Sequence, residues 1–203
     1  YLIITLVFTV GVILFAFYIA FHEYNIFSAP KFIGLNNFIR AFNTQDFRRS
    51  LVNVAWYAVV VTVVQTILAL LLAVLLNSKI RGKETFRTIF YTPSVTSSVV
   101  ISMIFWWLYL KAGFMNYFLD SFLGIFGVAF KPVDWLNDPR GLFQLIAQAF
   151  GGNIPSSQWA LRGPSVTLMA IMFQNIFTTI PTFMLMFLAA LQDIPGSVYE
   201  AAD

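Results

Sequence analysis

Residues 165–191, SVTLMAIMFQNIFTTIPTFMLMFLAAL, form an apolar run without Asp, Glu, Lys, Arg or His. About 27 residues at about 1.5 Å per residue make a helix of about 40 Å, which is long enough to cross a bilayer core of about 30 Å. The residues that follow, 192–203 (QDIPGSVYEAAD), are more polar, and Pro195 suits the first turn of a new helix. The sequence therefore predicts a spanning helix that turns into a short helix at the membrane surface.

The composition of the whole chain is typical of a membrane protein. Of its 203 residues, 59% are hydrophobic and only 10% are charged, whereas about a quarter are charged in a soluble domain. The absence of cysteine excludes disulfides and thiolate metal sites. The net charge of +3 comes from basic residues near the membrane edges, so we expect no nucleic-acid partner. Because Tyr1 already lies in an apolar run and Asp203 in a helix-forming one, we expect a fragment of a longer protein.

Three further apolar runs are long enough to span a bilayer, at about residues 2–21, 51–76 and 89–110. A secretory signal peptide is the alternative for 2–21, but this run is longer than the usual core of about 7–15 residues. Together with 165–191, these runs predict an all-α, multi-pass membrane protein with four visible spans in a helix bundle.

Two of these runs contain residues that predict contacts with other helices. Ala69 and Ala73 give the second span a face of small side chains for close packing, and its polar residues should avoid lipid: Asn53, Thr62, Gln65 and Thr66. Pro93 frees backbone carbonyls near the start of the third span, so we expect this turn to face protein or a cavity.

The segments between the spans are more polar. In 22–50 we expect a turn at Gly34 and a short surface helix with Asn36 as its N-cap. Segment 111–164 is rich in turns, with a further short helix near its middle. Within it, residues 112–130 are apolar enough for an additional span, but Asp120 and three glycines disfavour that alternative.

The loop 77–88 sets the expected orientation. Four basic residues lie between Lys79 and Arg87, and such density of positive charge is typical of a cytoplasmic loop. With four spans, this loop shares its side with both ends of the fragment. We therefore expect 77–88 and 192–203 to be cytoplasmic, and 22–50 and 111–164 to be extracytoplasmic.

The sequence offers little for catalysis. No span carries an acid, a base or a histidine in its interior, so ion-coupled transport is disfavoured and a partner should supply the energy. Gly82-Lys83 does not continue as a nucleotide-binding loop, because Glu84 stands where Ser or Thr should bind magnesium. Asp134 and Asp138 are spaced like turn formers. We expect no catalytic residues, no metal site and no cofactor in this chain.

Two spans carry uncharged polar side chains close to a proline. They are Ser94 and Ser98 after Pro93, and Gln174, Asn175, Thr178 and Thr179 before Pro181. Such residues either hold helices together or hydrogen-bond a polyol that crosses the membrane. For the second alternative, aromatic faces for sugar rings would come from Phe90, Tyr91, Trp106 and Phe177.

Four stretches resemble one transporter family. They are LQDIPGSVYEAA (191–202), FIGLNNF (32–38), LLNSKIRGKETFRTIF (75–90) and PVDWLNDP (132–139). In this combination the chain is similar to the permease subunits of bacterial ATP-binding-cassette importers, carbohydrate-type branch, and 191–202 resembles the start of their EAA loop.

The resemblance implies partners and site residues. Such a permease pairs with a second permease, two ATPase subunits that bind ATP and magnesium, and an extracytoplasmic solute-binding protein, in the bacterial plasma (inner) membrane. About two more spans would follow residue 203. Carried over by position, the substrate would meet Ser94, Ser98, Asn175, Thr178 and Thr179, and the ATPase would meet Tyr199, Glu200, Ala201 and Ala202. The family often has Leu-Pro and a second proline where this chain has Thr92-Pro93 and Ser97.

The sequence thus favours a sugar or oligosaccharide import permease that has no catalytic site of its own. An importer of another solute, such as glycerol phosphate or a polyamine, is one alternative. A helical membrane scaffold without a translocation path is the other.

Overall fold

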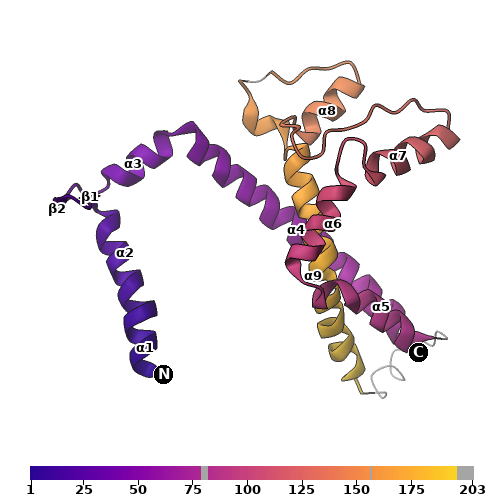
Figure 1. Cartoon of the computed structure of the whole chain (residues 1–203), viewed down its shortest axis with the longest axis horizontal. Coiled ribbons are helices and arrows are strands. Elements are labelled where there is room, and N and C mark those ends of the chain that lie inside the picture. The colour runs from indigo at the N-terminus through magenta and orange to yellow at the C-terminus, as the bar shows by residue number, and fades with distance from the viewer. Residues whose placement is uncertain (79–81, 156, 196–203) are drawn as a thin grey trace. The chain divides into compact units, whose positions relative to one another are not determined.

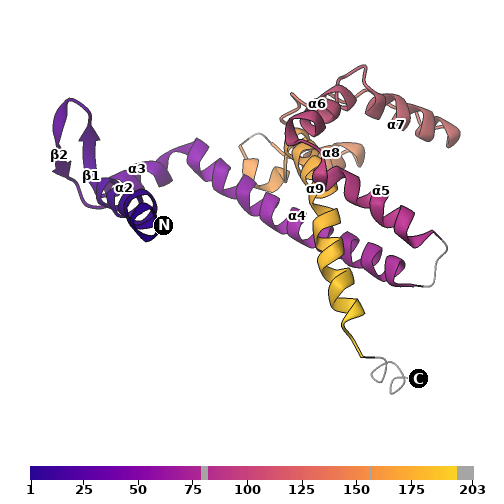
Figure 2. The ribbon, with the colours of Figure 1, turned by 60° about the horizontal axis from the view of Figure 1, so that its bottom comes forward.

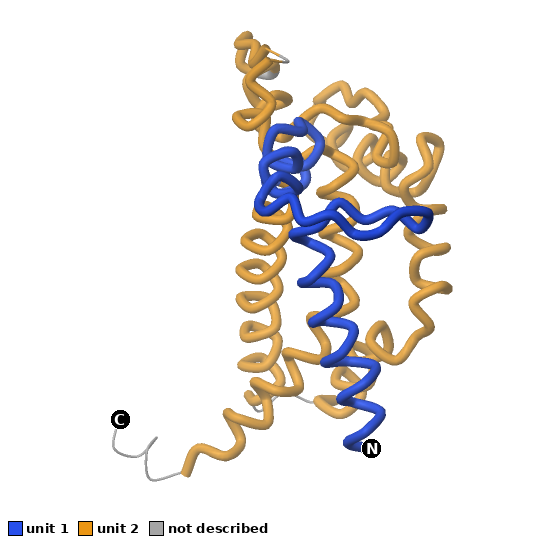
Figure 3. Tube along the Cα trace, turned by 90° about the vertical axis from the view of Figure 1, so that its left-hand side faces the viewer, with its two compact units in different colours: residues 1–52 blue, residues 53–203 orange. Residues whose placement is uncertain are grey.

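A computed structural model describes residues 1–78, 82–155 and 157–195. The chain divides into two compact units, residues 1–52 and 53–203 (Figure 3). Within the described residues, three helical segments are long and apolar enough to cross a membrane: Leu2–Ala20, Gln45–Asn77 and Val166–Gln192. A fourth span is added if a bent pair of helices is one span. The architecture is that of a helical membrane protein.

The first unit consists of an apolar helical run, a hairpin and a short helix. The run comprises α1 (Leu2–Thr5), the π-helix η1 (Leu6–Gly11) and α2 (Val12–Ala20). Strands β1 (His22–Asn25) and β2 (Ser28–Phe32) pair antiparallel, and α3 (Asn36–Asn43) follows (Figure 1). Asn37 fixes α3 to the hairpin, because its amide donates to the carbonyls of Ala20 and His22, each at 3.0 Å.

The hairpin corrects the all-α expectation. Asn25 makes the turn, since its side-chain oxygen accepts from the backbone N–H of Phe27 at 3.2 Å. Pro30 lies in β2, which is an edge strand, where a missing N–H donor is tolerated. The expected N-cap is also displaced: Leu35 takes that position and Asn36 is the first residue of α3. The turn before it uses Gly34 at φ 58°, as expected.

In the second unit, two long helices and a bent pair of shorter helices pack together. α4 (Gln45–Asn77) begins in the first unit and continues into the second, where it contacts α9 (Val166–Gln192). α5 (Lys83–Val95) and α6 (Ser98–Leu108) also contact α9 (Figures 1 and 2). Shorter elements complete the unit: α7 (Phe114–Ile125), α8 (Leu142–Ala149) and the 3-10 helix η2 (Trp159–Arg162).

Small side chains bring α4 and α9 together, as the sequence predicted. Ala69 and Ala73 are fully buried against Met184 and Leu188. Gln65 is also buried on this face of α4. By contrast, the described chain leaves Asn53 and Thr62 exposed.

The segment expected as the third span is two helices. α5 ends at Val95, α6 begins at Ser98, and their axes are bent by 94°. Pro93 lies inside the last turn of α5, where it removes one backbone donor. The hydroxyls of Ser94 and Thr96 donate to the carbonyls of Tyr91 and Thr92, each at 2.8 Å. Hydroxyls thus satisfy carbonyls next to the proline, and the chain also turns there.

A buried carboxylate organises the approach to α9. Asp138 accepts from the guanidinium of Arg140 through both oxygens and from its backbone N–H, and the Arg140 carbonyl accepts from the N–H of Val166 at 3.0 Å. The bonds from Arg140 hold the pKa of Asp138 below its usual range. Asp134 accepts from the Asn137 amide at 3.1 Å. Both aspartates therefore act as turn formers, as expected.

Replacing Asp138 with asparagine is expected to lower the unfolding temperature at neutral pH. We expect the free energy of unfolding to fall by about 1–2 kcal/mol, because one partner of a hydrogen-bonded ion pair is lost while Arg140 keeps access to water. A carboxyl with a lowered folded pKa stabilises above its unfolded pKa of about 3.9, and this contribution is lost as the pH falls through the folded value. The difference between wild type and Asp138→Asn should therefore shrink below about pH 3.9.

The measurement is thermal unfolding of the two proteins in detergent across this pH range. Asp120→Asn is the control, since Asp120 is exposed on α7, and its unfolding temperature should match wild type. A difference that persists unchanged in acid would contradict the role given to the Asp138 carboxylate.

Candidate functional site

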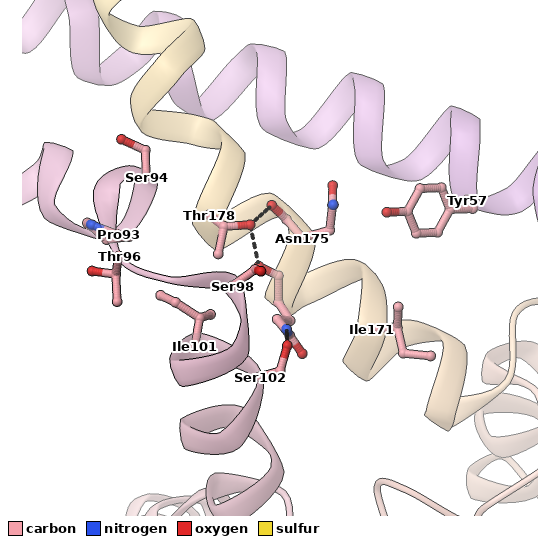
Figure 4. A pocket seen from close by; sticks show the side chains of 11 residues that line it. Tyr57, Pro93, Ser94, Thr96, Ser98, Ile101, Ser102, Ile171, Asn175 and Thr178 are labelled. Carbon is pink, nitrogen blue, oxygen red and sulfur yellow. Dashed lines mark hydrogen bonds between the residues drawn. The ribbon is translucent and has the colours of Figure 1, made fainter. Parts of the chain in front are cut away.

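A polar cavity of about 330 Å³ lies where α4, α5, α6 and α9 converge (Figure 4). The lining residues are Tyr57 of α4, Pro93 and Ser94 of α5, Thr96 after it, Ser98, Ile101 and Ser102 of α6, and Ile171, Gln174, Asn175 and Thr178 of α9. The structure thus brings together four of the five residues predicted to meet substrate: Ser94, Ser98, Asn175 and Thr178. Their sequence positions differ by up to 84 residues (178 − 94).

The bend between α5 and α6 gives the cavity one wall. Because the chain turns after Val95, residues from both sides of the turn face the same space. Ile101 is also buried against Ala170 of α9, which ties α6 to the opposite wall. A straight helix over 89–110 would have carried Ser94 and Ser98 on one continuous face instead.

α9 supplies the opposite wall, and one side-chain bond joins the two. Gln174 donates its amide hydrogen to the Ser102 hydroxyl at 2.9 Å. The hydroxyl of Thr178 lies 2.9 Å from the carbonyl of Asn175 and 3.2 Å from that of Gln174, and it donates toward them. Its oxygen keeps lone pairs for a donor in the cavity.

Three cavity side chains have no hydrogen-bond partner among residues 1–78, 82–155 and 157–195: those of Tyr57, Ser98 and Asn175. The Tyr57 hydroxyl points toward the Asn175 amide across the cavity (Figure 4). An amide offers two donors and an acceptor, and a hydroxyl offers one donor and two lone pairs. These groups are therefore free to bind a ligand that carries several hydroxyls.

Thr179, the fifth predicted residue, does not line the cavity. Its hydroxyl lies 2.7 Å from the side-chain oxygen of Gln65 and donates to it, which links α9 to α4. The same hydroxyl oxygen lies 2.8 Å from the Asn175 carbonyl. For Thr179 the geometry favours the helix-packing interpretation of the polar residues.

Among the residues that the structure describes, no Asp, Glu, Lys, Arg or His side chain lines the cavity. Its polar groups are hydroxyls and amides, which donate and accept hydrogen bonds. Likewise, no cluster of three or more His, Cys, Asp or Glu side chains lies within the described ranges in a position to hold a metal ion. The cavity side chains offer neutral hydrogen-bond donors and acceptors.

The aromatic residues differ from those expected. Phe90 packs against the cluster of Ala69 and Leu76, and Phe177 packs on Phe105 with ring centroids 5.4 Å apart. Tyr91 lines a separate pocket with Arg87 and Thr88. None of these three aromatic residues lines the central cavity.

Trp106 and Tyr57 are the aromatic side chains near the central cavity. Trp106 lines an adjacent hollow of about 360 Å³, which shares Ser98 and Ser102 with the cavity. Tyr57 lines the cavity itself and was missed from the sequence. Helical spacing is the signal that could have identified Tyr57. Tyr57, Val61 and Gln65 are four residues apart and therefore lie on one face of α4, and this face is buried from Val61 onwards.

The residues expected to contact an ATPase, Tyr199, Glu200, Ala201 and Ala202, lie outside the described residues. α9 ends at Gln192, and the described chain continues to Pro195. The contact of these four residues with an ATPase stays a prediction.

The solved structures that resemble this chain include two of bacterial transporters. In a crystal structure of a bacterial ABC transporter involved in the import of the acidic polysaccharide alginate, the matching chain is 19% identical with a TM-score of 0.67, and the match covers 98% of this chain and 58% of that one. In a crystal structure of a bacterial alginate ABC transporter in complex with an alginate pentasaccharide-bound periplasmic protein, identity is 19%, the TM-score is 0.57, and 84% and 49% are covered. No protein-family model and no curated protein matches the chain. The chain therefore shares a fold with these transporter chains and spans about half of their length.

Proposed function

We propose that the chain is part of the permease of an ATP-driven importer of sugars or oligosaccharides in a bacterial plasma membrane. The observation that carries the proposal is the cavity, where hydroxyls and amides from α4, α6 and α9 converge without a charged side chain. Polyols need such neutral donors and acceptors. The fold shared with chains of two alginate transporters supports the same function class.

The proposed assembly follows the resemblance found in the sequence. A second permease subunit would complete the pathway, and two ATPase subunits would hydrolyse ATP and hold its magnesium. An extracytoplasmic solute-binding protein would deliver the sugar, and the periplasmic protein bound in one similar structure supports that partner. The chain itself would be non-catalytic, with an EAA-type loop over residues 192–203 as the contact to the ATPase.

The proposed topology has four spans, with 77–88 and 192–203 in the cytoplasm and 22–50 and 111–164 outside. The bent pair α5 and α6 would form the third span, because the two helices together are apolar enough to cross a bilayer. α7, with 12 residues, is about 18 Å long at about 1.5 Å per residue, which is shorter than a bilayer core of about 30 Å.

Within this class, the cavity favours a neutral saccharide over an acidic one. The similar structures belong to importers of an acidic polysaccharide. In this chain, however, the cavity lining carries no arginine or lysine that would pair with a carboxylate. Importers of glycerol phosphate or a polyamine, which carry charge, fit less well for the same reason, and a scaffold without a path would leave the unpaired Asn175 amide unexplained.

The deciding experiment measures ATPase activity of the full-length protein, co-purified in lipid with the subunits encoded beside it. Binding proteins loaded with neutral sugars, with uronates or with glycerol phosphate are added in turn. Stimulation by one neutral-sugar complex is the expected result. Stimulation by a uronate complex alone would overturn the neutral substrate, and a stable protein without any co-purifying ATPase would favour the scaffold.

Replacing Asn175 with alanine is expected to weaken the response to substrate. The change removes an amide that has no other partner among the described residues and contacts the cavity. Loss of one hydrogen bond costs about 0.5–1.5 kcal/mol, so half-maximal stimulation should need roughly two- to tenfold more loaded binding protein.

Thr182→Ala is the matched control for Asn175→Ala. Thr182 is exposed on the same helix and does not line the cavity, so its response should equal wild type. An Asn175→Ala response equal to that of the control would remove Asn175 from the substrate site.

A further inference from the structure

Four phenylalanine side chains form an exposed row along α7 and its C-cap. Phe114, Phe118, Phe122 and Phe126 are spaced by four residues, and consecutive ring centroids lie 6.2, 6.1 and 5.4 Å apart. Their exposed fractions are 51%, 51%, 48% and 67%. A contiguous aromatic surface of this kind is unfavourable in water, so we expect it to be covered.

The first turn of α7 is fixed to the rest of the second unit. Met115 packs against the cluster of Phe105, Tyr109 and Ala170, where α6 ends and α9 begins. Asn116 is buried, and its amide donates to the carbonyls of Lys111 and Val133, each at 2.8 Å. The phenylalanine row is therefore held outward, since a rotation of α7 would break these contacts.

Asn116 also accepts two bonds that fix the following loop. Its side-chain oxygen takes the N–H of Val133 at 3.1 Å and the indole N–H of Trp135 at 2.9 Å. Both donors and the acceptor of this side chain are thus used inside the protein. A buried amide with this many partners stabilises one orientation of the helix.

The position of α7 indicates what covers the row. α7 runs across the direction of α9, beside the end of α9 that starts at Val166, in two views (Figures 1 and 2). Trp106 and Trp107, in the last turn of α6, are exposed at the same end of the bundle. Exposed tryptophans at the end of a spanning helix are typical of the membrane interface.

The charges beside α7 match lipid phosphates. Lys111 precedes the helix, Lys131 follows it, and both are exposed. Asp120 lies on α7 two residues from Phe118, which turns it about 160° away from that side chain around the helix axis. In the sequence, one lysine thus precedes the aromatic row and one follows it, and Asp120 lies on another side of the helix from Phe118.

We propose that α7 is an interfacial helix that lies parallel to the plasma membrane, at its extracytoplasmic surface. Its phenylalanine row inserts at the boundary between headgroups and acyl chains, about 5–10 Å deep, and Lys111 and Lys131 contact lipid phosphates. Through Met115 and Phe105, this helix connects the lipid surface to the end of α6, the helix that carries Ser98 and Ser102. The inference requires a membrane protein but no particular substrate.

The test places one nitroxide label on each face of α7 in the full-length assembly. No cysteine in these 203 residues has to be removed first. Phe118→Cys carries the label in the aromatic row, and Asp120→Cys is the matched position on the other face of the same helix. Both residues are exposed. The samples are nanodiscs of phosphatidylethanolamine and phosphatidylglycerol.

Collision of each label with oxygen and with a water-soluble nickel chelate is then measured by electron paramagnetic resonance. We expect the ratio of oxygen to nickel collisions to be several-fold higher at position 118 than at 120. Equal, nickel-dominated collisions would place the row in water. Low collision with both reagents at 118 would mean that a protein partner covers the row. Either of these two results would overturn the proposal, and neither bears on sugar-stimulated ATPase activity.

Discussion

Gly141→Ala is expected to destabilise the protein by about 3 kcal/mol, at the upper end of the range for overpacking a closely packed site. The Cβ atom of an alanine would overlap the carbonyl oxygen of Arg162 and lie 2.7 Å from the Arg162 Cβ. The backbone angles of Gly141, φ −81° and ψ 153°, are open to any residue, so the cost is purely steric.

The surrounding backbone cannot move away easily. Gly141 pairs with Ser165 in an antiparallel bridge. On either side, Leu142 donates to the carbonyl of Pro164 at 2.9 Å and Val166 donates to that of Arg140 at 3.0 Å. Relief of the overlap would break at least one of these bonds and would disturb the start of α9.

Gly124→Ala is the control, and heat-induced loss of folded protein in detergent is the measurement. A Cβ at Gly124, inside α7, would meet no atom within 4 Å. Alanine there should be neutral or stabilise by roughly 0.5–1 kcal/mol, because it favours the helix. Equal unfolding temperatures for Gly141→Ala and Gly124→Ala would show that the junction between residues 141 and 165 is not closely packed.

Glu200→Lys is expected to abolish sugar uptake while the protein still inserts and assembles. This expectation rests on the proposed EAA-type loop, because residue 200 lies outside the described residues. A carboxylate on a segment that docks into a partner contributes to the charge complementarity of the contact, and reversal of its charge is expected to disrupt that complementarity. Transport and ATP hydrolysis would then be uncoupled.

Uptake of labelled sugar into proteoliposomes measures this effect, with basal ATPase activity recorded in parallel. Ser78→Lys is the control, since Ser78 is exposed at the end of α4, in the loop that we place in the cytoplasm. It introduces a lysine on the same side of the membrane and should leave uptake unchanged. Normal uptake by Glu200→Lys would remove the coupling role from this segment.

The long helices were predictable because length and apolar composition alone determine them. The apolar run 51–76 lies within α4, which begins six residues earlier (51 − 45), and the run 165–191 differs from α9 by one residue at each end. The close contact at Ala69 and Ala73 was also predictable, and it is confirmed, since small side chains at this spacing leave room for a neighbouring helix. These properties depend on the helix itself and on its nearest neighbour.

Features that depend on tertiary contacts were not predictable. The hairpin rests on one Asn25 turn and on bonds from Asn37, which is distant in sequence. Pro93 indicated a disturbed turn but not a bend of 94°, because the bend also needs α9 for Ile101 and Phe105 to pack against.

The candidate site was predictable in part for a similar reason. Ser94, Ser98, Asn175 and Thr178 stand beside prolines in apolar runs, where polar side chains are conspicuous. Tyr57 was missed and Thr179 was grouped with the other four residues, because the sequence does not show which side of a helix faces the cavity and which faces another helix. Thr179 bonds Gln65, whereas Tyr57 contributes its hydroxyl to the cavity.

The bend between α5 and α6 also constrains the order of events during synthesis at the membrane. α5 has 13 residues and α6 has 11, so each is too short to cross alone, yet together they are apolar enough to enter the bilayer as one segment. The bent form packs against Ala170 of α9, which leaves the ribosome later. We therefore expect nascent chains that end before residue 165 to hold 89–110 as a straight transmembrane helix, which bends only after α9 has inserted.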